Sequence, residues 1–275
     1  MNIIQVEEKL RSFLSEDIGH RDLTSSTIFP MDYVDEAKVI AKEAGVFSGA
    51  NLIQYVYRII SNEVKVTLYK HDQDLIQSGD VLATITGPVQ IILTGERVML
   101  NLLQRMSGIA TITQKAIKTL NNPSINICDT RKTTPGFRLF EKHAITCGGG
   151  FNHRHGLYDG VMIKDNHIAA AGSITQAVEK VKNTLGHMVM IEVETESEAQ
   201  VQEAIQAGAH IIMFDNQSPQ SIHKLSKLVP SYITTEASGG ITLNNLNDYN
   251  TCVIDYISLG FLTHSAHSLD ISLTI

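Results

Sequence analysis

The sequence predicts an α/β protein in which a mixed α+β first part precedes a parallel α/β barrel. Up to about residue 120, helical and strand patterns follow one another without regular alternation. From residue 125, short apolar strands alternate with amphipathic helices, which is typical of parallel strands joined by helices. A barrel is favoured over an open sheet because polar residues follow every strand. In an open sheet they would be expected mainly at the one switch point where the strand order reverses.

The first part of the chain shows both periodicities. Apolar residues recur at a helical spacing from Ile3 to Phe13, and alternate from Val64 to Leu68. The tail AHSLDISLTI alternates as well, so we expect it to return as a strand to the first part. The predicted elements are helices over 3–14, around 52–59 and over 94–120, with Gly108 interrupting the last, and strands at 64–68 and 81–85.

The second part repeats one strand–helix unit. We predict strands near 125–129, 161–165, 188–194, 210–215, 231–237 and 256–260, and helices over 137–146, 173–185, 196–207, 219–229 and 242–249. Helix-start residues support this, with Ser173, Ser218-Pro219 and Thr242 as expected N-caps and Gly208 as a residue that ends a helix. The predicted domains are 1–110, joined by the tail 266–275, and 111–265.

Composition narrows the classes of ligand and location. The chain has 275 residues and a net charge of -7, which argues against a nucleic-acid partner. However, residues 128–167 hold six Lys/Arg against four Asp/Glu, and such a local basic island suggests a small anionic ligand. The three scattered cysteines fit a reducing cytosol. The absence of a signal-peptide pattern and of a long apolar run predicts a cytoplasmic protein without a membrane span.

Polar or glycine residues end each of the six predicted strands. Because the carboxyl ends of parallel barrel strands surround one mouth, we expect these residues to form a single site. In strand order they are Asp129-Thr130-Arg131-Lys132, Lys164-Asp165-Asn166-His167, Glu192 with Glu194, Asp215-Asn216, Glu236-Ala237-Ser238-Gly239-Gly240, and Gly260.

The basic residues of this set suit a ligand with carboxylates and phosphates. An arginine grips a carboxylate with two donors, and a lysine is a compact charge for phosphate, although Arg131-Lys132 could equally be a solvated surface pair. Lys164 needs an anionic partner at the barrel mouth, and a salt bridge to Asp165 or Glu194 is the alternative. His153 and Arg154 lie in a glycine-rich loop, where His153 and His155 give only a weak metal signal.

The acidic and glycine residues suit a metal and phosphates. Glu194 and Asp215 end adjacent strands, and two carboxylates beside phosphates suit Mg²⁺, although they could be ordinary ion-pair residues. Ser238-Gly239-Gly240 and Gly260 follow the last strands, where barrels commonly bind phosphate, although a simple tight turn would look the same. No nucleophile motif is present, which favours transfer by positioning and charge stabilisation.

At these residues the sequence resembles the quinolinate phosphoribosyltransferase family. The matching segments are EDIGHRDLTS, GERVMLNLLQRMSGIAT, DTRKTTPGFR, HAITCGGGFNHRHGLYDGVMIKDNH, IEVET, IIMFDN, EASGGIT and ISLGFLTHSAHSLDIS. They span nearly the whole chain in family order. The resemblance implies an N-terminal α/β sandwich domain and a C-terminal incomplete barrel of about seven parallel strands, one more than the six read from the residues.

The resemblance also implies an activity: transfer of phosphoribosyl from 5-phosphoribosyl-1-pyrophosphate (PRPP) to quinolinate, with Mg²⁺, giving nicotinate mononucleotide, pyrophosphate and CO₂. It implies a homodimer with a shared active site, higher assembly being left open. The implied quinolinate ligands are Arg131, His153, Arg154, Lys164 and, from the neighbouring subunit, Arg97, with Arg138 as a further anion contact. The implied PRPP ligands are Lys132, Glu194, Asp215, Ser238, Gly239, Gly240, Gly260 and His264, with Glu194 and Asp215 also at the metal.

Two other functions stay open on the sequence. A divergent pyrophosphorylase-like protein linked to molybdate transport would share the barrel, but the retained set Arg131, His153, Arg154 and Lys164 argues against it. A barrel that senses a phosphorylated ligand without catalysis would not need the metal-suited pair Glu194 and Asp215.

Overall fold

The computed structural model describes residues 1–275 and divides them into two compact units. The first unit comprises Met1–Gln114, Thr134–Gly149 and Ser265–Ile275, and the second comprises Lys115–Thr133 and Gly150–His264. The chain therefore passes between the units several times. None of the helices is long and apolar enough to cross a membrane.

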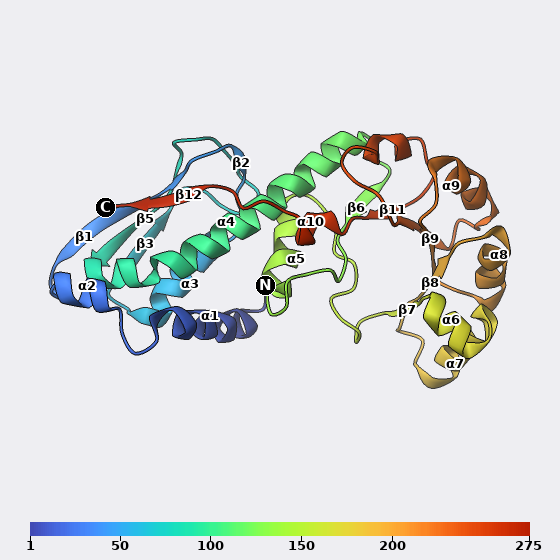
Figure 1. The fold of residues 1–275 in the computed structure, drawn as a ribbon, viewed down its shortest axis with the longest axis horizontal. Coiled ribbons are helices and arrows are strands. Elements are labelled where there is room, and N and C mark those ends of the chain that lie inside the picture. Colours follow the sequence, from blue (N-terminus) through green and yellow to red (C-terminus); the bar gives the residue numbers. More distant parts are fainter. The chain divides into compact units, whose positions relative to one another are not determined.

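The first unit is built on a four-stranded antiparallel sheet with the order β12-β1-β5-β3. The C-terminal strand β12 pairs with β1 through the register Val39–Leu273, and the two ribbons run side by side in Figure 1. The elements are α1 (Ile3–Ile18), α2 (Leu23–Ile28), β1 (Val34–Ala41), β2 (Gly45–Val46), α3 (Ala50–Ile60), β3 (Lys65–Leu68), β4 (Leu75–Ile76), β5 (Val81–Pro88), α5 (Arg138–Cys147) and β12 (Ile271–Thr274), together with α4 (Val89–Leu120) as far as Gln114.

The prediction that Gly108 interrupts the long helix is wrong, because α4 runs without a break through this residue. A Cβ built on Gly108 would lie 1.9 Å from the carbonyl oxygen of His267. The glycine therefore does not end the helix. It leaves room for the backbone of the C-terminal segment to cross the helix at close range.

The second unit contains a six-stranded parallel sheet with the order β6-β11-β10-β9-β8-β7. The first strand in sequence pairs with the last, so the sheet curls back on itself as a barrel does. A single parallel bridge joins Cys128 of β6 to Phe151, and this is all that a seventh strand contributes. The barrel is thus incomplete, and its strands are β6 (Asn126–Cys128), β7 (Val161–Ile163), β8 (Ile191–Thr195), β9 (Ile211–Asp215), β10 (Thr234–Ser238) and β11 (Tyr256–Ser258).

Most helices of the second unit begin and end where their caps predict. Ser173 and Ser218 accept hydrogen bonds as N-caps, and Gly208 ends its helix in the left-handed conformation. The helices are α6 (Asp165–Ala171), α7 (Ile174–Thr184), α8 (Glu198–Ala207), α9 (Pro219–Leu225), the 3-10 turns η1 (Ser226–Leu228) and η2 (Leu246–Tyr249), and α10 (Phe261–His264).

The prediction of a helix over 242–249 is wrong for the first half of that range. Only η2 forms there, and its N-cap is Asn245, whose side chain accepts the backbone N–H of Thr242. An asparagine that accepts a local backbone hydrogen bond holds the chain in a turn and competes with a helix.

Candidate active site

A cavity of about 750 Å³ opens within the second unit, at the carboxyl ends of its strands. Its wall includes every residue predicted to bind a substrate or the metal except Arg97 and Arg138, whereas Asp129, Asp165, Asn166, His167, Glu192, Glu236 and Ala237 of the strand-end set do not line it. The lining residues are Thr130, Arg131, Lys132, His153, Arg154, Met162, Lys164, Glu194, Met213, Asp215, Asn216, Ser238, Gly239, Gly240, Ile241, Thr242, Ser258, Gly260, Phe261 and His264. The expected convergence of strand ends on one mouth is therefore present.

Strand periodicity places the acidic residues inside the barrel. Successive side chains of a strand point to opposite faces, so Glu192 and Glu194 of β8 share a face. The register pairs Glu194 with Met213 and Ser238 with Asp215, which brings the ends of three neighbouring strands to one level. Parallel strands with such ends present charge to the cavity without interrupting the apolar interior.

The basic half of the cavity is poorly solvated. Burial lowers the pKa of Arg154, and the nearby charge of Arg131 lowers it further. The Nη1 of Arg154 donates to the carbonyl oxygen of Gly160 at 2.9 Å, which fixes the direction of the guanidinium. Two guanidinium groups that repel each other in a half-buried place are stabilised by an anion between them.

Lys164 follows β7 and forms an ion pair with Glu194 in the ligand-free protein. The salt bridge that the sequence left open as an alternative is thus the observed arrangement. Burial raises the pKa of the Glu194 carboxyl, Lys164 opposes that shift, and the charges of Asp215 and Glu192 add to it. A further positive charge near Glu194 and Asp215 would therefore be favourable.

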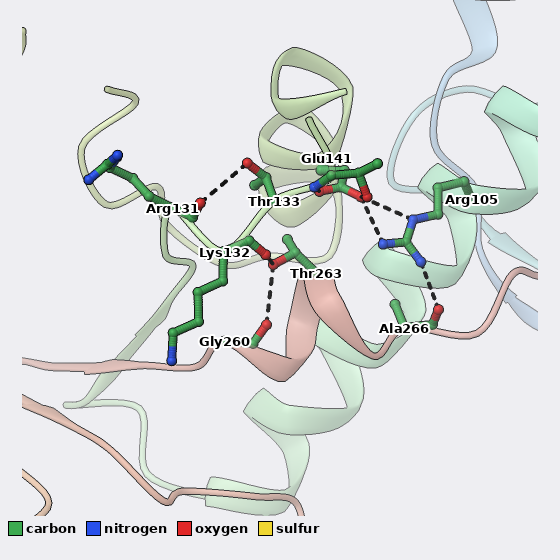
Figure 2. A network of polar contacts seen from close by, with 9 residues as sticks. Arg105, Arg131, Lys132, Thr133, Glu141, Gly260, Thr263 and Ala266 are labelled. Atoms are coloured by element: carbon green, nitrogen blue, oxygen red, sulfur yellow. Dashed lines mark hydrogen bonds and ion pairs between the residues drawn. The ribbon is translucent and has the colours of Figure 1, made fainter. Parts of the chain in front are cut away.

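The segment that carries Lys132 is held by Thr263, a residue close to the C-terminal end of the second unit. The hydroxyl of Thr263 donates to the carbonyl oxygen of Lys132 at 2.8 Å and lies 3.2 Å from that of Gly260, as Figure 2 shows. A Cβ on Gly260 would come within 3.1 Å of Lys132 Cδ and 3.2 Å of the His264 ring. Gly260 therefore lets the side chains of Lys132 and His264 lie against the backbone of this turn.

The turn after β10 depends on two consecutive glycines. Gly239 and Gly240 have φ angles of 88° and 65°, which side-chain-bearing residues rarely adopt. A Cβ on Gly239 would meet the side-chain oxygen of Asn216 at 2.3 Å, whereas one on Gly240 would meet nothing within 4 Å. Asn216 itself has a φ of 52° and donates its backbone N–H to Ser238. Of the two glycines, only Gly239 therefore packs closely against the residue that follows β9.

His153 occupies a place that sequence reasoning did not foresee. Its backbone N–H donates to Asp129, which is fully buried, and its ring Nε2 lies 2.9 Å from Glu192 and 3.7 Å from Glu236. His155 lies outside this group and is exposed, so the HxH spacing brings no pair of histidines together. The only sequence signal for the group was the occurrence of both glutamates at strand ends.

The two remaining predicted residues belong to the first unit. Arg138 is the first residue of α5, and Arg97 of α4 lines a separate cavity of about 330 Å³ with Glu16 and Asp17. In the same unit, the fully buried Glu141 accepts from Arg105 at 2.8 Å, and Arg105 also donates to the carbonyl oxygen of Ala266 (Figure 2). This pair joins α4 and α5 to the C-terminal segment.

Comparison with known proteins identifies the family. Residues 109–274 match the model of the quinolinate phosphoribosyl transferase C-terminal domain, and residues 22–107 match that of the N-terminal domain. The chain belongs to the quinolinate phosphoribosyltransferase family. A Bacillus subtilis relative, a probable nicotinate-nucleotide pyrophosphorylase (carboxylating), is 52% identical over 275 residues, covering 100% of this chain and 95% of the relative.

Other members of the family are more distant but cover the same length. A mitochondrial quinolinate phosphoribosyltransferase (decarboxylating) from Nicotiana tabacum is 38% identical, over 95% of this chain and 80% of its own. The crystal structure of NadC from Streptococcus pyogenes matches with a TM-score of 0.96 and 40% identity, covering 100% of this chain and 97% of that one. The fold described above is therefore that of the family.

The two glycines of the β10 turn make a matched test of the geometry. We expect Gly240→Ala to lower the free energy of unfolding by about 1–2 kcal/mol, the range for a left-handed residue that gains a Cβ. Gly239→Ala should lower it further, because its Cβ must also displace Asn216. Urea unfolding of both variants measures the difference. Equal losses would contradict the close packing of Gly239 on β9.

Proposed function

We propose that this chain transfers the phosphoribosyl group of PRPP to quinolinate and releases the 2-carboxylate as CO₂. The products are nicotinate mononucleotide and pyrophosphate, and the pathway served is NAD biosynthesis. One observation carries the proposal: a single cavity, in a chain of this family, holds Arg131, Lys132, Arg154 and Lys164 beside Glu194 and Asp215. The name of the Bacillus subtilis relative describes the same reaction written in reverse.

The basic side chains provide the binding energy and the orientation of the dicarboxylate. Arg131 and Arg154 would hold its two carboxylates, with Lys164 and His153 alongside, so that the ring nitrogen faces C1 of the ribose. Fixing two reactants in a reactive geometry removes much of the entropic part of the barrier. Binding also requires Lys164 to share its charge between the ligand and Glu194, its partner in the ligand-free protein.

The opposite wall suits a phosphorylated ribose. Ser238, Gly239 and Gly240 offer backbone N–H groups, and Gly260, Lys132 and His264 meet at one turn. Mg²⁺ would fit between this wall and the acids, because burial and the nearby charges of Asp215 and Glu192 raise the pKa of the half-buried Glu194 carboxyl, and a cation would offset that repulsion. A bound Mg²⁺ would neutralise charge on the leaving pyrophosphate. Glu194 and Asp215 would hold it, directly or through the ribose and water.

The bond changes follow from the reactants. The ring nitrogen forms a bond to C1 as the bond from C1 to pyrophosphate breaks, and positive charge develops on the ribose. Glu194 and Asp215 stabilise that charge because they are held in place before reaction. The ring then carries a quaternary nitrogen, so the adjacent carboxylate leaves as CO₂ while its electron pair stays on the ring carbon. A proton replaces it there.

The proposal extends to assembly and place in the cell. Arg97 would reach the quinolinate site of a partner copy in a homodimer, and we propose Arg138 as a further anion contact. We propose a cytoplasmic enzyme whose partners are its two small substrates.

Incubation with quinolinate, PRPP and Mg²⁺ tests the reaction. We expect equal amounts of CO₂ and nicotinate mononucleotide, measured by release of labelled CO₂ and by chromatography. PRPP binding without pyrophosphate release would contradict the proposal and favour a ligand sensor. Turnover with a different acceptor in place of quinolinate would favour a divergent transferase.

Arg154→Ala tests the dicarboxylate grip. The loss of one charge-assisted hydrogen bond, about 1.5–3 kcal/mol, predicts a fall in kcat/KM for quinolinate of about 10- to 100-fold, with a higher KM or no measurable turnover. Steady-state kinetics at saturating PRPP measures it. Lys180→Ala removes an exposed positive charge from α7 of the same unit and should leave kcat/KM unchanged. Unchanged kinetics in the Arg154 variant would reject its role.

Co-expression of Arg97→Ala with Arg154→Ala tests the shared site. Each variant alone should have little activity. In a two-fold dimer, half of the mixed molecules are heterodimers with one intact site of two, so about a quarter of the wild-type activity should return. The activity of the mixture relative to the separate variants is the measurement. A mixture no more active than its components would show that Arg97 does not act across a dimer interface.

A further inference from the structure

Two buried glutamates and one histidine lie on the inner side of the cavity, within the barrel. Glu192 comes from β8, Glu236 from β10, and His153 from the glycine-rich loop, and one ligand atom of each lies within 4.8 Å of the others. Glu192 is 3% exposed and Glu236 is 4% exposed. His153 lines the cavity, whereas neither glutamate does. The proposed reaction places His153 beside the dicarboxylate but assigns no role to Glu192 or Glu236, and these three residues are called the trio.

The hydrogen bonds of the trio supply one N–H for two carboxyl groups. The Nδ1 of His153 accepts the backbone N–H of Arg154 at 2.8 Å, so a neutral ring carries its proton on Nε2. That proton points to Glu192 Oε2 at 2.9 Å, and Glu236 Oε1 lies further away at 3.7 Å. Glu192 Oε1 and Glu236 Oε1 have no hydrogen-bond partner, although the hydroxyl group of Ser258 lies near enough to Glu236 to lower its pKa. One N–H thus serves two buried carboxyl groups.

Two carboxylates this close in a dry interior cannot both stay ionised. Burial and the charge of Glu192 raise the pKa of Glu236 to about 7, while His153 and Ser258 oppose the shift and the more remote Glu194 adds to it. The strands on either side contribute Met213 and Tyr256 at the paired positions, and neither supplies a charge that would hold Glu236 ionised at neutral pH.

We propose that Glu236 is the member of the trio that holds a proton near neutral pH, and that a dicarboxylate bound in the cavity favours this protonated form, so that binding takes up a proton wherever Glu236 is still ionised. Glu192 then carries the negative charge and accepts the His153 N–H. Glu236 is a positioning residue, because it acts through His153 and Glu192 and does not line the cavity. The second half of this proposal rests on the proposed function; the first half does not.

The direction of the coupling follows from charge. A dianion bound above the trio favours the protonated form of Glu236, so it raises the pKa of that group further. Below pH 7 the proton is already present and the affinity for the dianion should be constant. As pH rises above 7, binding must bring a proton with it, so the affinity should fall by at most tenfold per pH unit.

The same three side chains have the composition of a metal site, and this alternative makes a different prediction. A cation would have to replace the Nε2 proton of His153 and would keep both glutamates ionised. Whether the Glu236 carboxyl is protonated therefore distinguishes a bound proton from a bound metal cation.

Infrared spectroscopy of the ligand-free protein tests the first half. We expect the carbonyl band of a protonated carboxyl group near neutral pH, disappearing with a midpoint of about pH 7 and missing from Glu236→Gln. Glutamine keeps the size and neutrality of the protonated side chain, so this variant should fold. Glu203→Gln is the matched control, since Glu203 is a half-buried acceptor for Thr175 in the same unit, and it should keep the band.

Calorimetric titration with quinolinate, without PRPP, tests the second half. Repeating the titration at pH 8 in buffers of different ionisation enthalpy gives the number of protons taken up. We expect a sizeable fraction of one proton for the wild type and for Glu203→Gln, and a smaller uptake for Glu236→Gln, whose affinity should also lose most of its pH dependence.

The outcomes are distinct. Absence of the band, or a band that survives in Glu236→Gln, would overturn the assignment of the proton. A band with equal proton uptake in all three proteins would overturn the coupling. A band together with no binding of quinolinate, with or without PRPP, would leave the proton on Glu236 and reject the proposed function and the coupling with it.

Discussion

The central constraint on this protein is the crowding of opposite charges in one half-buried mouth. Four basic side chains and two carboxylates line a cavity whose walls lower the pKa of Arg154 and raise that of Glu194, both chiefly through burial. Charges in such surroundings are tolerated only when each has a partner. The ion pair of Lys164 and Glu194 meets part of this demand, and an anion bound beside Arg131 and Arg154 would add to it.

The parallel barrel can accommodate these charges because they lie at the carboxyl ends of its strands. Ile191, Val193 and Ile212 are buried on the opposite face of the same strands, where the sheet packs without charges. The exception is the trio of Glu192, Glu236 and His153, which lies one level deeper. Polar groups there need internal hydrogen bonds, and the count of available protons decides their charge state.

Periodicity and caps were sufficient to predict the alternating strands, the helices from Ser173 and Ser218, and the meeting of the strand-end residues. They failed where tertiary contacts override local pattern. Gly108 looks like a helix interruption, yet its role is visible only once His267 is known to cross it. Thr242 has the residue type of an N-cap, but its backbone N–H donates to Asn245, and the helical turn begins only after that residue. The seventh strand consists of one bridge at Phe151, too short to leave a pattern. Burial of Glu236 could not be read either, since a glutamate at a strand end predicts exposure as readily as a site.

The pairing of β12 with β1 has a consequence for how the protein is made. The sheet that begins at Val34 gains this strand only after residues 150–264 have been synthesised, so the second unit leaves the ribosome while the first still lacks an edge. Contacts between segments so far apart in sequence slow folding, and an unpaired edge can recruit the wrong strand. The nascent chain must therefore keep the outer side of β1 free of other strands until translation has passed residue 274.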